Sequence, residues 1–193
     1  GARRRQFTHV AKALGIRERD EAGLVDQASL RGKVDHDVRM GLNAFAMSDL
    51  LRNACTFLFV PATQPERLHK ALASQADMVI ADWEDAVAPA DKAQAREALV
   101  AAVQTLSAAQ RARLLVRINA AGTAWFDGDV QALARLVAQG MAGAVVPKSE
   151  SPAQLSVIAE QAGAACALVA LVETVTGIDA LDALARAPQV QRL

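Results

Sequence analysis

The sequence predicts an α/β protein built on a parallel β-sheet, and three observations support this prediction. From residue 56 onward, short apolar segments alternate with helical segments five times in succession. The apolar segments are continuous rather than alternating, as is typical of strands that are buried on both faces. Several of the helical segments open with a proline or a capping residue. Before residue 56, apolar periodicity indicates short helices, and no segment resembles a strand.

The elements follow one another in a regular order. We expect strands at TFLFVP (56–61), MVIAD (78–82), RLLVRIN (113–119), GAVVPK (143–148) and ALVALVE (167–173). We expect helices at PERLHKALASQA (65–76), PADKAQAREALVAAVQTL (89–106), GDVQALARLVAQG (128–140), SPAQLSVIAEQAG (151–163) and GIDALDALARA (177–187). Pro65 and Pro89 suit first turns, Gly140 suits a C-cap, and Ser151 followed by Pro152 suits an N-terminus. A sixth strand is expected to begin near residue 190.

Composition limits the functional classes. The 193 residues carry 21 Lys and Arg against 21 Asp and Glu, so the formal net charge is zero and nucleic acid is not an expected partner. No apolar run reaches the roughly 18 residues that cross a bilayer, so no membrane partner is expected.

We interpret Cys55 and Cys166 as buried thiols, and the three histidines as surface residues. The arginine-rich start lacks an apolar signal core, so a cytoplasmic location is expected.

Polar residues follow every predicted strand. Asp82, Glu84 and Asp85 follow the second strand, and Arg117 and Asn119 end the third. Pro147 and Lys148 end the fourth strand and Glu173 ends the fifth. The carboxyl ends of parallel strands share one edge, so these groups should converge there. Such a cluster suits a hard divalent cation and an anionic substrate. The alternative for each residue alone is a helix cap, a local ion pair or a solvated surface side chain.

Two architectures fit this pattern: a (β/α)8 barrel and an open, doubly wound sheet. A nucleotide-binding open sheet is less favoured, because neither GxGxxG nor GxxxxGK[ST] follows the first strand.

Five motifs in order resemble the HpcH/HpaI aldolase and citrate lyase family, in its citrate lyase β-subunit-like and malyl-CoA lyase branch. These motifs are LFVPATQPERLHKAL, ADMVIADWEDAVAPADKAQARE, LLVRINAAGTAWFDGDV, GAVVPKSE and ALVALVETVTGI, and they span roughly residues 56–193. The resemblance implies a TIM-type (β/α)8 barrel. It also implies an oligomeric, Mg²⁺-dependent lyase that breaks a carbon–carbon bond in an acyl-CoA thioester such as citryl-CoA or malyl-CoA. The small-molecule partner that the resemblance implies beside the thioester is a keto acid or a dicarboxylate.

The resemblance also implies roles for individual residues. Glu173 matches a metal-binding glutamate, and Arg117 matches the arginine that binds the substrate's oxygens. Glu84 and Asp85 match acids that hold metal-bound water. Phe59 and Lys70 lie where relatives contact CoA. No residue is an obvious base for the substrate hydroxyl.

This sequence departs from the family pattern in several places. Gln64 replaces an arginine that contacts CoA, Ala62 replaces a glycine, Trp83 a leucine and Thr176 an arginine. The second metal ligand of the family, an aspartate, is expected beyond Leu193, so a truncated barrel of about five β–α units is predicted. Residues 47–193 are expected to form this partial barrel. Residues 1–46 would be a helical extra module or extraneous sequence, with the second interpretation slightly favoured. Two alternatives to the lyase stay open: a non-catalytic partial barrel or partner subunit, and an acyl-CoA thioesterase.

Overall fold

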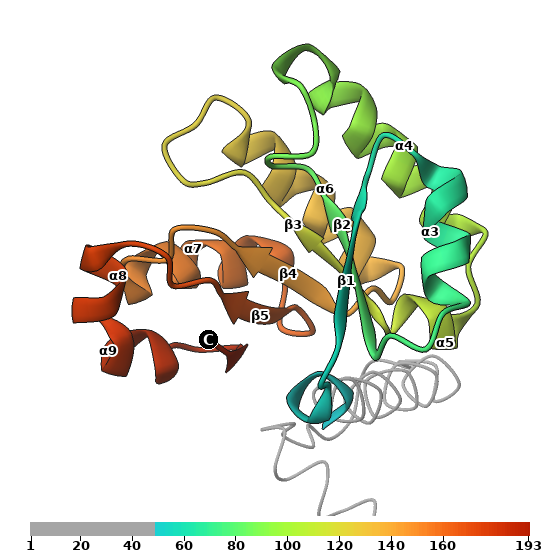
Figure 1. The fold of residues 1–193 in the computed structure, drawn as a ribbon. Coiled ribbons are helices and arrows are strands. Elements are labelled where there is room, and N and C mark those ends of the chain that lie inside the picture. Colours follow the sequence, from blue (N-terminus) through green and yellow to red (C-terminus); the bar gives the residue numbers. More distant parts are fainter. Residues whose placement is uncertain (1–48) are drawn as a thin grey trace, which may run out of the picture. The chain divides into compact units, whose positions relative to one another are not determined.

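Six strands form one parallel sheet whose spatial order is the order of the sequence (Figure 1). The computed structural model describes residues 49–193. The strands are β1 (Phe57–Pro61), β2 (Met78–Asp82), β3 (Leu114–Arg117), β4 (Gly143–Val146), β5 (Ala167–Ala170) and β6 (Val190–Arg192). Sequential order is the order of a (β/α)8 barrel, whereas a doubly wound sheet reverses direction at a switch point. The five predicted strands are confirmed, and β6 adds the sixth. The segment 1–46 lies outside the described residues.

Helices follow the strands along the outside of the sheet (Figure 1). They are α3 (Pro65–Leu72), η1 (Pro89–Asp91), α4 (Lys92–Gln104), α5 (Ala108–Arg111), α6 (Phe126–Ala138), α7 (Pro152–Ala162), α8 (Val175–Asp179) and α9 (Leu181–Ala185). Pro65 and Pro152 stand in first turns, and the Ser151 side chain accepts from the Gln154 N–H, as predicted. Gly140 follows the last residues of α6 with φ +93°, a conformation that suits glycine.

Two local predictions need correction. The predicted helix over 177–187 is two short helices, α8 and α9, that meet at Ala180. Helix α5 was not predicted, although its signal is present: Ser107 and Gln110 form a capping box at its start.

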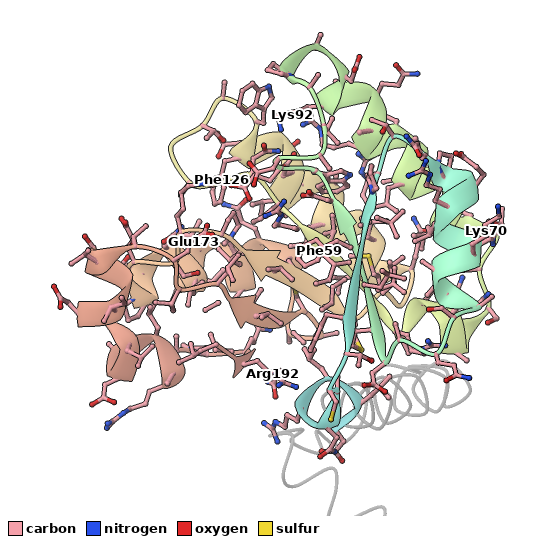
Figure 2. The ribbon with its side chains drawn as sticks, viewed as in Figure 1. Phe59, Lys70, Lys92, Phe126, Glu173 and Arg192 are labelled. Carbon is pink, nitrogen blue, oxygen red and sulfur yellow. The ribbon has the colours of Figure 1, made fainter. Side chains whose placement is uncertain are left out.

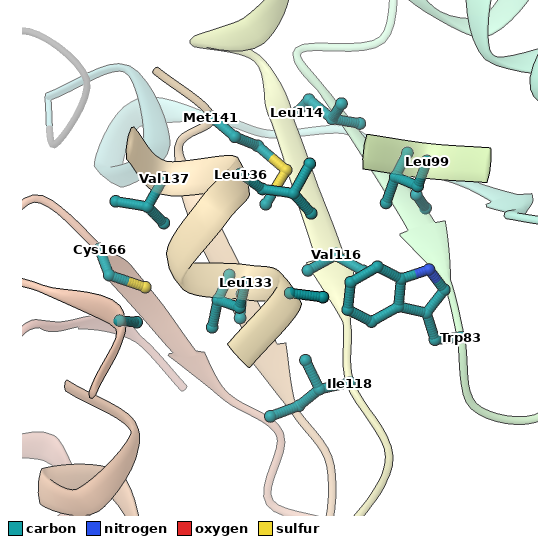
Figure 3. Close-up of a cluster of buried hydrophobic side chains, with 14 of the residues drawn as sticks. Trp83, Leu99, Leu114, Val116, Ile118, Leu133, Leu136, Val137, Met141 and Cys166 are labelled. Carbon is teal, nitrogen blue, oxygen red and sulfur yellow. The ribbon is translucent and has the colours of Figure 1, made fainter. Parts of the chain in front are cut away.

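The two faces of the sheet pack against different partners. Apolar side chains on the outer face, such as Val79 and Val116, meet the helices in the larger core, shown in part in Figure 3. Trp83, which replaces a leucine of the family motif, is fully buried in this core. The inner face forms a second, smaller cluster. It contains Met78, Ile80, Leu115 and Val145 from the strands, together with Leu51 and Ala54 from the segment before β1.

The sheet has two free edges, because β1 and β6 are its outermost strands. At its amino end the Arg192 side chain reaches from β6 to β1 and to the segment before it. Arg192 of β6 donates hydrogen bonds to the carbonyl oxygens of Leu51, Arg52 and Ala54, and its guanidinium lies 5.2 Å from the Phe57 ring centroid of β1. Leu58 and Phe59 are exposed, so the expectation that every strand is buried on both faces does not hold for β1.

The cysteine prediction is half wrong. Cys166 is buried, and burial raises the pKa of its thiol to about 12. Cys55 is exposed, because it lies just before edge strand β1 rather than within the sheet. His69 is exposed as predicted, whereas His9 and His36 lie outside the described residues. No helix within residues 49–193 is long and apolar enough to cross a membrane.

Candidate active site

The strand register brings the predicted polar residues to one end of the sheet. Asp82 pairs with Arg117 as the last residue of β2 and β3, and Arg117 pairs with Val145 near the end of β4. Side chains that follow β4 and β5 therefore face the same edge, which we call the carboxyl rim. The convergence expected for parallel strands is present in the structure.

Arg117 and Asp82 form the central ion pair of the rim. Nε and Nη2 of Arg117 donate to the two carboxylate oxygens of Asp82 at 2.8 and 2.6 Å. The same two oxygens accept the backbone N–H groups of Glu84 and Ala86 at 2.8 and 3.1 Å. Asp82 therefore orients the guanidinium and also shapes the segment 82–86, which we call the acid turn. The hydrogen bonds from Arg117 to Asp82 raise the pKa of Arg117 above its ordinary value, so it stays charged.

The third nitrogen of the Arg117 guanidinium faces the other two acids of the acid turn. Nη1 lies 3.2 Å from Glu84 Oε2 and 3.4 Å from Asp85 Oδ2. The Glu84 side chain is almost buried, whereas the Asp85 side chain is 77% exposed. The guanidinium also lies 5.2 Å from the Phe59 ring centroid, within the range of a cation–π contact. Asp85 is thus the most exposed of the three carboxylates around Arg117.

Lys148 links the acid turn to Glu173. Its Nζ lies 2.8 Å from Glu84 Oε1 and 4.0 Å from Glu173 Oε1, and its backbone N–H donates to Glu173 Oε1 at 3.1 Å. The hydrogen bond to Glu84 raises the pKa of Lys148, so the ammonium form persists at neutral pH. Lys148 was recognised from its place after a strand, and the structure adds its two carboxylate partners.

The backbone around Lys148 is unusual and closely packed. Lys148 has φ +47°, a left-handed conformation that costs free energy in a residue with a side chain. A Cβ atom at Gly177 in α8 would lie 2.5 Å from the carbonyl oxygen of Ser149. The turn that carries Glu173 and the loop that carries Lys148 therefore fit together only because residue 177 is glycine.

Phe59 and Lys70 lie along the exposed edge of β1. A shallow groove of about 370 Å³ is lined by both residues together with Leu58, Val60, Pro61, Arg67 and Ala71. Figure 2 shows Phe59 on β1 between Lys70, on the side of α3, and Glu173. The groove thus contains Phe59, whose ring lies next to the Arg117 guanidinium, and two cationic side chains, Arg67 and Lys70. The roles predicted for these two residues stay predictions.

The rim offers oxygen ligands for a divalent cation, but few of them are uncommitted. No group of three or more His, Cys, Asp or Glu side chains within residues 49–193 is arranged to hold a metal ion. Asp82 and Glu84 are already occupied by Arg117 and Lys148. Glu173, whose side chain is 38% exposed, retains carboxylate oxygen capacity that faces solvent. Since Mg²⁺ is commonly held by one or two carboxylates with water and substrate oxygens, Glu173 fits one such position.

Sequence reasoning missed the buried residues beneath the rim. For Asp82 the simplest interpretation was a cap of the next helix or a pair with a nearby base. The structure shows the pair, with Arg117 as the partner, whereas the backbone N–H groups that Asp82 accepts belong to the acid turn and not to a helix. Asn119 and Lys92 are buried beneath the acid turn, and Asp129 on α6 accepts hydrogen bonds from Asn119. The signal for Lys92 was weak, because a lysine in a first helical turn normally faces solvent.

The fold and the rim define a class of protein, namely (β/α)8-type barrels whose charged site lies at the carboxyl ends of the strands. The chain belongs to the HpcH/HpaI aldolase/citrate lyase family, whose model matches residues 56–193. This confirms the resemblance deduced from the five motifs.

Similar proteins narrow the branch. A citrate lyase subunit beta-like protein of Mycobacterium tuberculosis is 42% identical over 121 residues, which are 63% of this chain and 39% of that protein. An L-malyl-CoA/beta-methylmalyl-CoA lyase of Cereibacter sphaeroides is 40% identical over 96 residues, which are 50% of this chain and 30% of the lyase. A (3S)-malyl-CoA thioesterase of the same species is 34% identical over 102 residues, 53% and 34% of the two chains.

Solved structures of protein CitE from M. tuberculosis resemble this fold. The complex with magnesium and pyruvate has a TM-score of 0.61 at 40% identity, and covers 72% of this chain and 53% of its own. The complex with magnesium, acetoacetate and coenzyme A has a TM-score of 0.59 at 40% identity, and covers 72% and 47%. The chain thus spans about half the length of these solved relatives, and less of the curated ones.

Proposed function

We propose that this chain carries most of the active site of a Mg²⁺-dependent carbon–carbon lyase that cleaves a 3-hydroxyacyl-CoA such as citryl-CoA or malyl-CoA. The observation that carries the proposal is the geometry of Arg117. Asp82 orients its guanidinium from one side. The nitrogen on the other side meets two acids of the acid turn, Glu84 and exposed Asp85. An oriented cation with a displaceable partner is suited to bind an anion that forms during a reaction.

The proposed reaction is a retro-aldol cleavage. The substrate hydroxyl loses its proton and becomes the carbonyl of the released keto acid. The bond between the hydroxyl-bearing carbon and the α-carbon of the thioester breaks, and its electron pair moves onto the acyl-CoA fragment as an enolate. Protonation of the α-carbon then gives the acyl-CoA product. Arg117 stabilises the negative charge that develops on oxygen, and one such preorganised donor is worth about 10²-fold in rate.

Glu173 is the residue that would hold Mg²⁺ at the rim. Bound Mg²⁺ supplies Lewis-acid stabilisation of oxygen charge. Formal charge favours the ion, because four carboxylates (Asp82, Glu84, Asp85 and Glu173) outnumber the three nearby cations, which are Arg117 and Lys148 at the rim and Lys92 beneath the acid turn. Relatives solved with magnesium and a keto acid support this part of the proposal.

The groove at the β1 edge is the proposed place for the CoA part of the substrate. Lys70 and Arg67 offer cations for phosphate, and Phe59 offers an apolar face next to Arg117. The similarity to a CoA complex supports this placement. Because Gln64 replaces an arginine of the family pattern, Arg67 takes on part of the phosphate contact in this proposal. A homo-oligomeric, cytoplasmic protein stays our prediction.

The test is a product assay on the 193-residue chain with Mg²⁺ and either malyl-CoA or citryl-CoA. A lyase releases acetyl-CoA together with glyoxylate or oxaloacetate, and releases no free thiol. Chromatography of the CoA species and a keto-acid-specific dehydrogenase follow both products. The assay is repeated with EDTA, and with Arg117→Ala as the matched inactive chain. Absence of keto acid at millimolar Mg²⁺ would contradict the lyase.

A thioesterase is the second candidate, because a (3S)-malyl-CoA thioesterase is among the similar proteins. The same assay separates the two reactions, since hydrolysis yields free CoA and malate and no glyoxylate. A thiol reagent that measures free CoA also reacts with exposed Cys55. The signal of the protein without substrate is therefore subtracted. If the assay gives neither keto acid nor free CoA, the third alternative is favoured, namely a partial barrel without turnover of its own.

A further inference from the structure

Lys92 is buried in an unusual environment beneath the rim. It is the first residue of α4 and is 4% exposed, and Figure 2 shows it at the end of the molecule opposite Arg192. A buried ammonium normally has a carboxylate partner, because removing the charge from water is costly. Among residues 49–193, no carboxylate lies within ion-pair distance of Lys92. Burial accordingly lowers its pKa.

The ammonium of Lys92 is committed to the backbone of the acid turn. Its Nζ donates to the carbonyl oxygens of Trp83 and Glu84, both at 2.8 Å. These carbonyls belong to the peptide units on either side of Glu84, and their orientation sets where the Glu84 side chain points. Asp82 holds the N–H groups of the same turn from the rim. The acid turn is therefore fixed on both sides, by Asp82 above and Lys92 beneath.

Lys92 also contacts the loop between β3 and α6. Its Nζ lies 4.9 Å from the ring centroid of Trp125, within cation–π range. At the start of that loop, Asn119 Nδ2 donates to the Trp83 carbonyl at 3.2 Å and to Asp129 at 2.7 Å. The Trp83 carbonyl is thus shared by two donors from two elements. The acid turn and this loop are coupled through Lys92 and Asn119.

We propose that Lys92 is a positioning residue that holds the acid turn so that Glu84 meets Arg117 and Lys148. The inference rests on the proposed function for its effect on turnover, but its structural content stands independently. Glu84 has no direct contact with Lys92 through its carboxylate; the effect passes through two carbonyl groups. Without the ammonium of Lys92 the acid turn can move. The Glu84 carboxylate is then no longer held in the position from which it contacts both Arg117 and Lys148.

The test compares Lys92→Met with Arg135→Met. Methionine has nearly the shape of lysine without its donors. Arg135 is a matched control. Its side chain on α6 pairs with Glu97 on α4 at the exposed surface, away from the rim, so Arg135→Met also removes one cation. Lys92→Met is expected to lower kcat by about tenfold or more, with KM changed less than about threefold, as when supporting contacts of a site are removed. Arg135→Met leaves both constants unchanged.

Amide hydrogen exchange gives a readout that does not need turnover. In Lys92→Met, exchange should rise in segments 83–87 and 119–125, while β4 and β5 keep wild-type protection. Wild-type exchange in both segments would overturn the proposal, as would a kcat equal to that of Arg135→Met. If wild type shows no turnover, the proposed function fails by itself, and exchange still decides the role of Lys92.

A second variant covers the case in which Lys92→Met loosens the whole protein. Trp125→Leu removes the ring that lies over Lys92 but leaves the two hydrogen bonds from Lys92 to the carbonyl groups. Trp125 is itself partly exposed, so its replacement disturbs the core little. We expect faster exchange in both 119–125 and 83–87, because the ammonium loses its cover. Faster exchange in 119–125 alone would show that the two segments are independent, and would overturn the coupling.

Discussion

Arg113 and Arg117 lie at opposite ends of β3, and the two ends of the sheet use arginine in different ways. Arg117, at the carboxyl end, binds carboxylates: Asp82 in a two-pronged contact, with Glu84 and Asp85 at its free nitrogen. Arg113 lies just before the amino end, and within residues 49–193 its side chain donates to backbone carbonyl oxygens alone. Those oxygens belong to Leu72, Ser74, Ala76 and Asp77.

The difference shows how the molecule separates stability from function. Four carbonyls converging on one guanidinium fix a loop, because no ligand can replace them without unfolding it. Carboxylates around a guanidinium are held by charge. An exposed carboxylate such as Asp85 is held weakly, so another anion can take its place. The amino end is therefore expected to respond to mutation in stability, and the carboxyl rim in ligand binding and rate.

Arg117→Ala should have the largest effect. Turnover in the lyase assay is expected to fall about 10²-fold or more, because one preorganised donor to the developing oxyanion is lost. Arg117→Lys should restore only part of the rate, because an ammonium cannot grip Asp82 with two parallel hydrogen bonds. Thermal melts confirm that both variants fold. A lysine variant with wild-type turnover would show that charge alone suffices.

Glu173→Ala should have the next largest effect, on Mg²⁺ affinity. Loss of a carboxylate oxygen ligand is expected to weaken Mg²⁺ binding about tenfold or more, measured by isothermal titration calorimetry. Glu160→Ala is the matched control, because Glu160 is an exposed acid on α7. Equal Mg²⁺ affinity for both variants would remove Glu173 from the metal site.

Arg113→Met should act on stability without affecting the rim. Its four carbonyl partners surround the loop before β2, and losing them is expected to cost roughly 2 kcal/mol of unfolding free energy. Urea denaturation measures that cost, and the Mg²⁺ titration should match wild type. A loss of Mg²⁺ binding in this variant would break the separation between the two ends.

Sequence reasoning found the sheet and most of the rim for one physical reason. Apolar runs that end in charge mark buried parallel strands, and parallel strands place their ends together, so Asp82, Arg117 and Glu173 followed from position alone. Lys92 could not be found this way. Its burial depends on the path of the chain after the acid turn, which brings two carbonyls over the first residue of α4.

The exposure of Cys55 and Phe59 was also missed. Both belong to the edge strand or its approach, and a sequence pattern does not reveal which strand lies at an edge. An apolar run has the same appearance in the centre of a sheet and at its margin. The partners of a strand, rather than its own residues, decide how much of it is covered.

The smallest predicted effect concerns pH and the amino end. Asp77 Oδ2 accepts hydrogen bonds from the Cys55 N–H, the Thr56 N–H and the Thr56 hydroxyl at 2.8, 2.8 and 2.9 Å. The backbone hydrogen bonds from Cys55 and Thr56 lower the pKa of Asp77 below its ordinary value in the folded protein. A lowered folded-state pKa contributes stability that is complete above the unfolded pKa and is lost as pH falls through the folded one.

The melting temperature of wild type should therefore fall more steeply below about pH 4 than that of Asp77→Asn, whose amide does not titrate. Above about pH 5 the difference between the two should be constant. Glu160→Gln is the control, because an exposed helical acid should leave the acid limb of the curve unchanged. Parallel curves for wild type and Asp77→Asn down to pH 2 would mean that the carboxylate does not secure the start of β1. The contrast between the two ends of the sheet would then rest on Arg113 alone. In that case the neutral amide of the Asp77→Asn variant would hold Thr56 and the start of β1 as well as the carboxylate does.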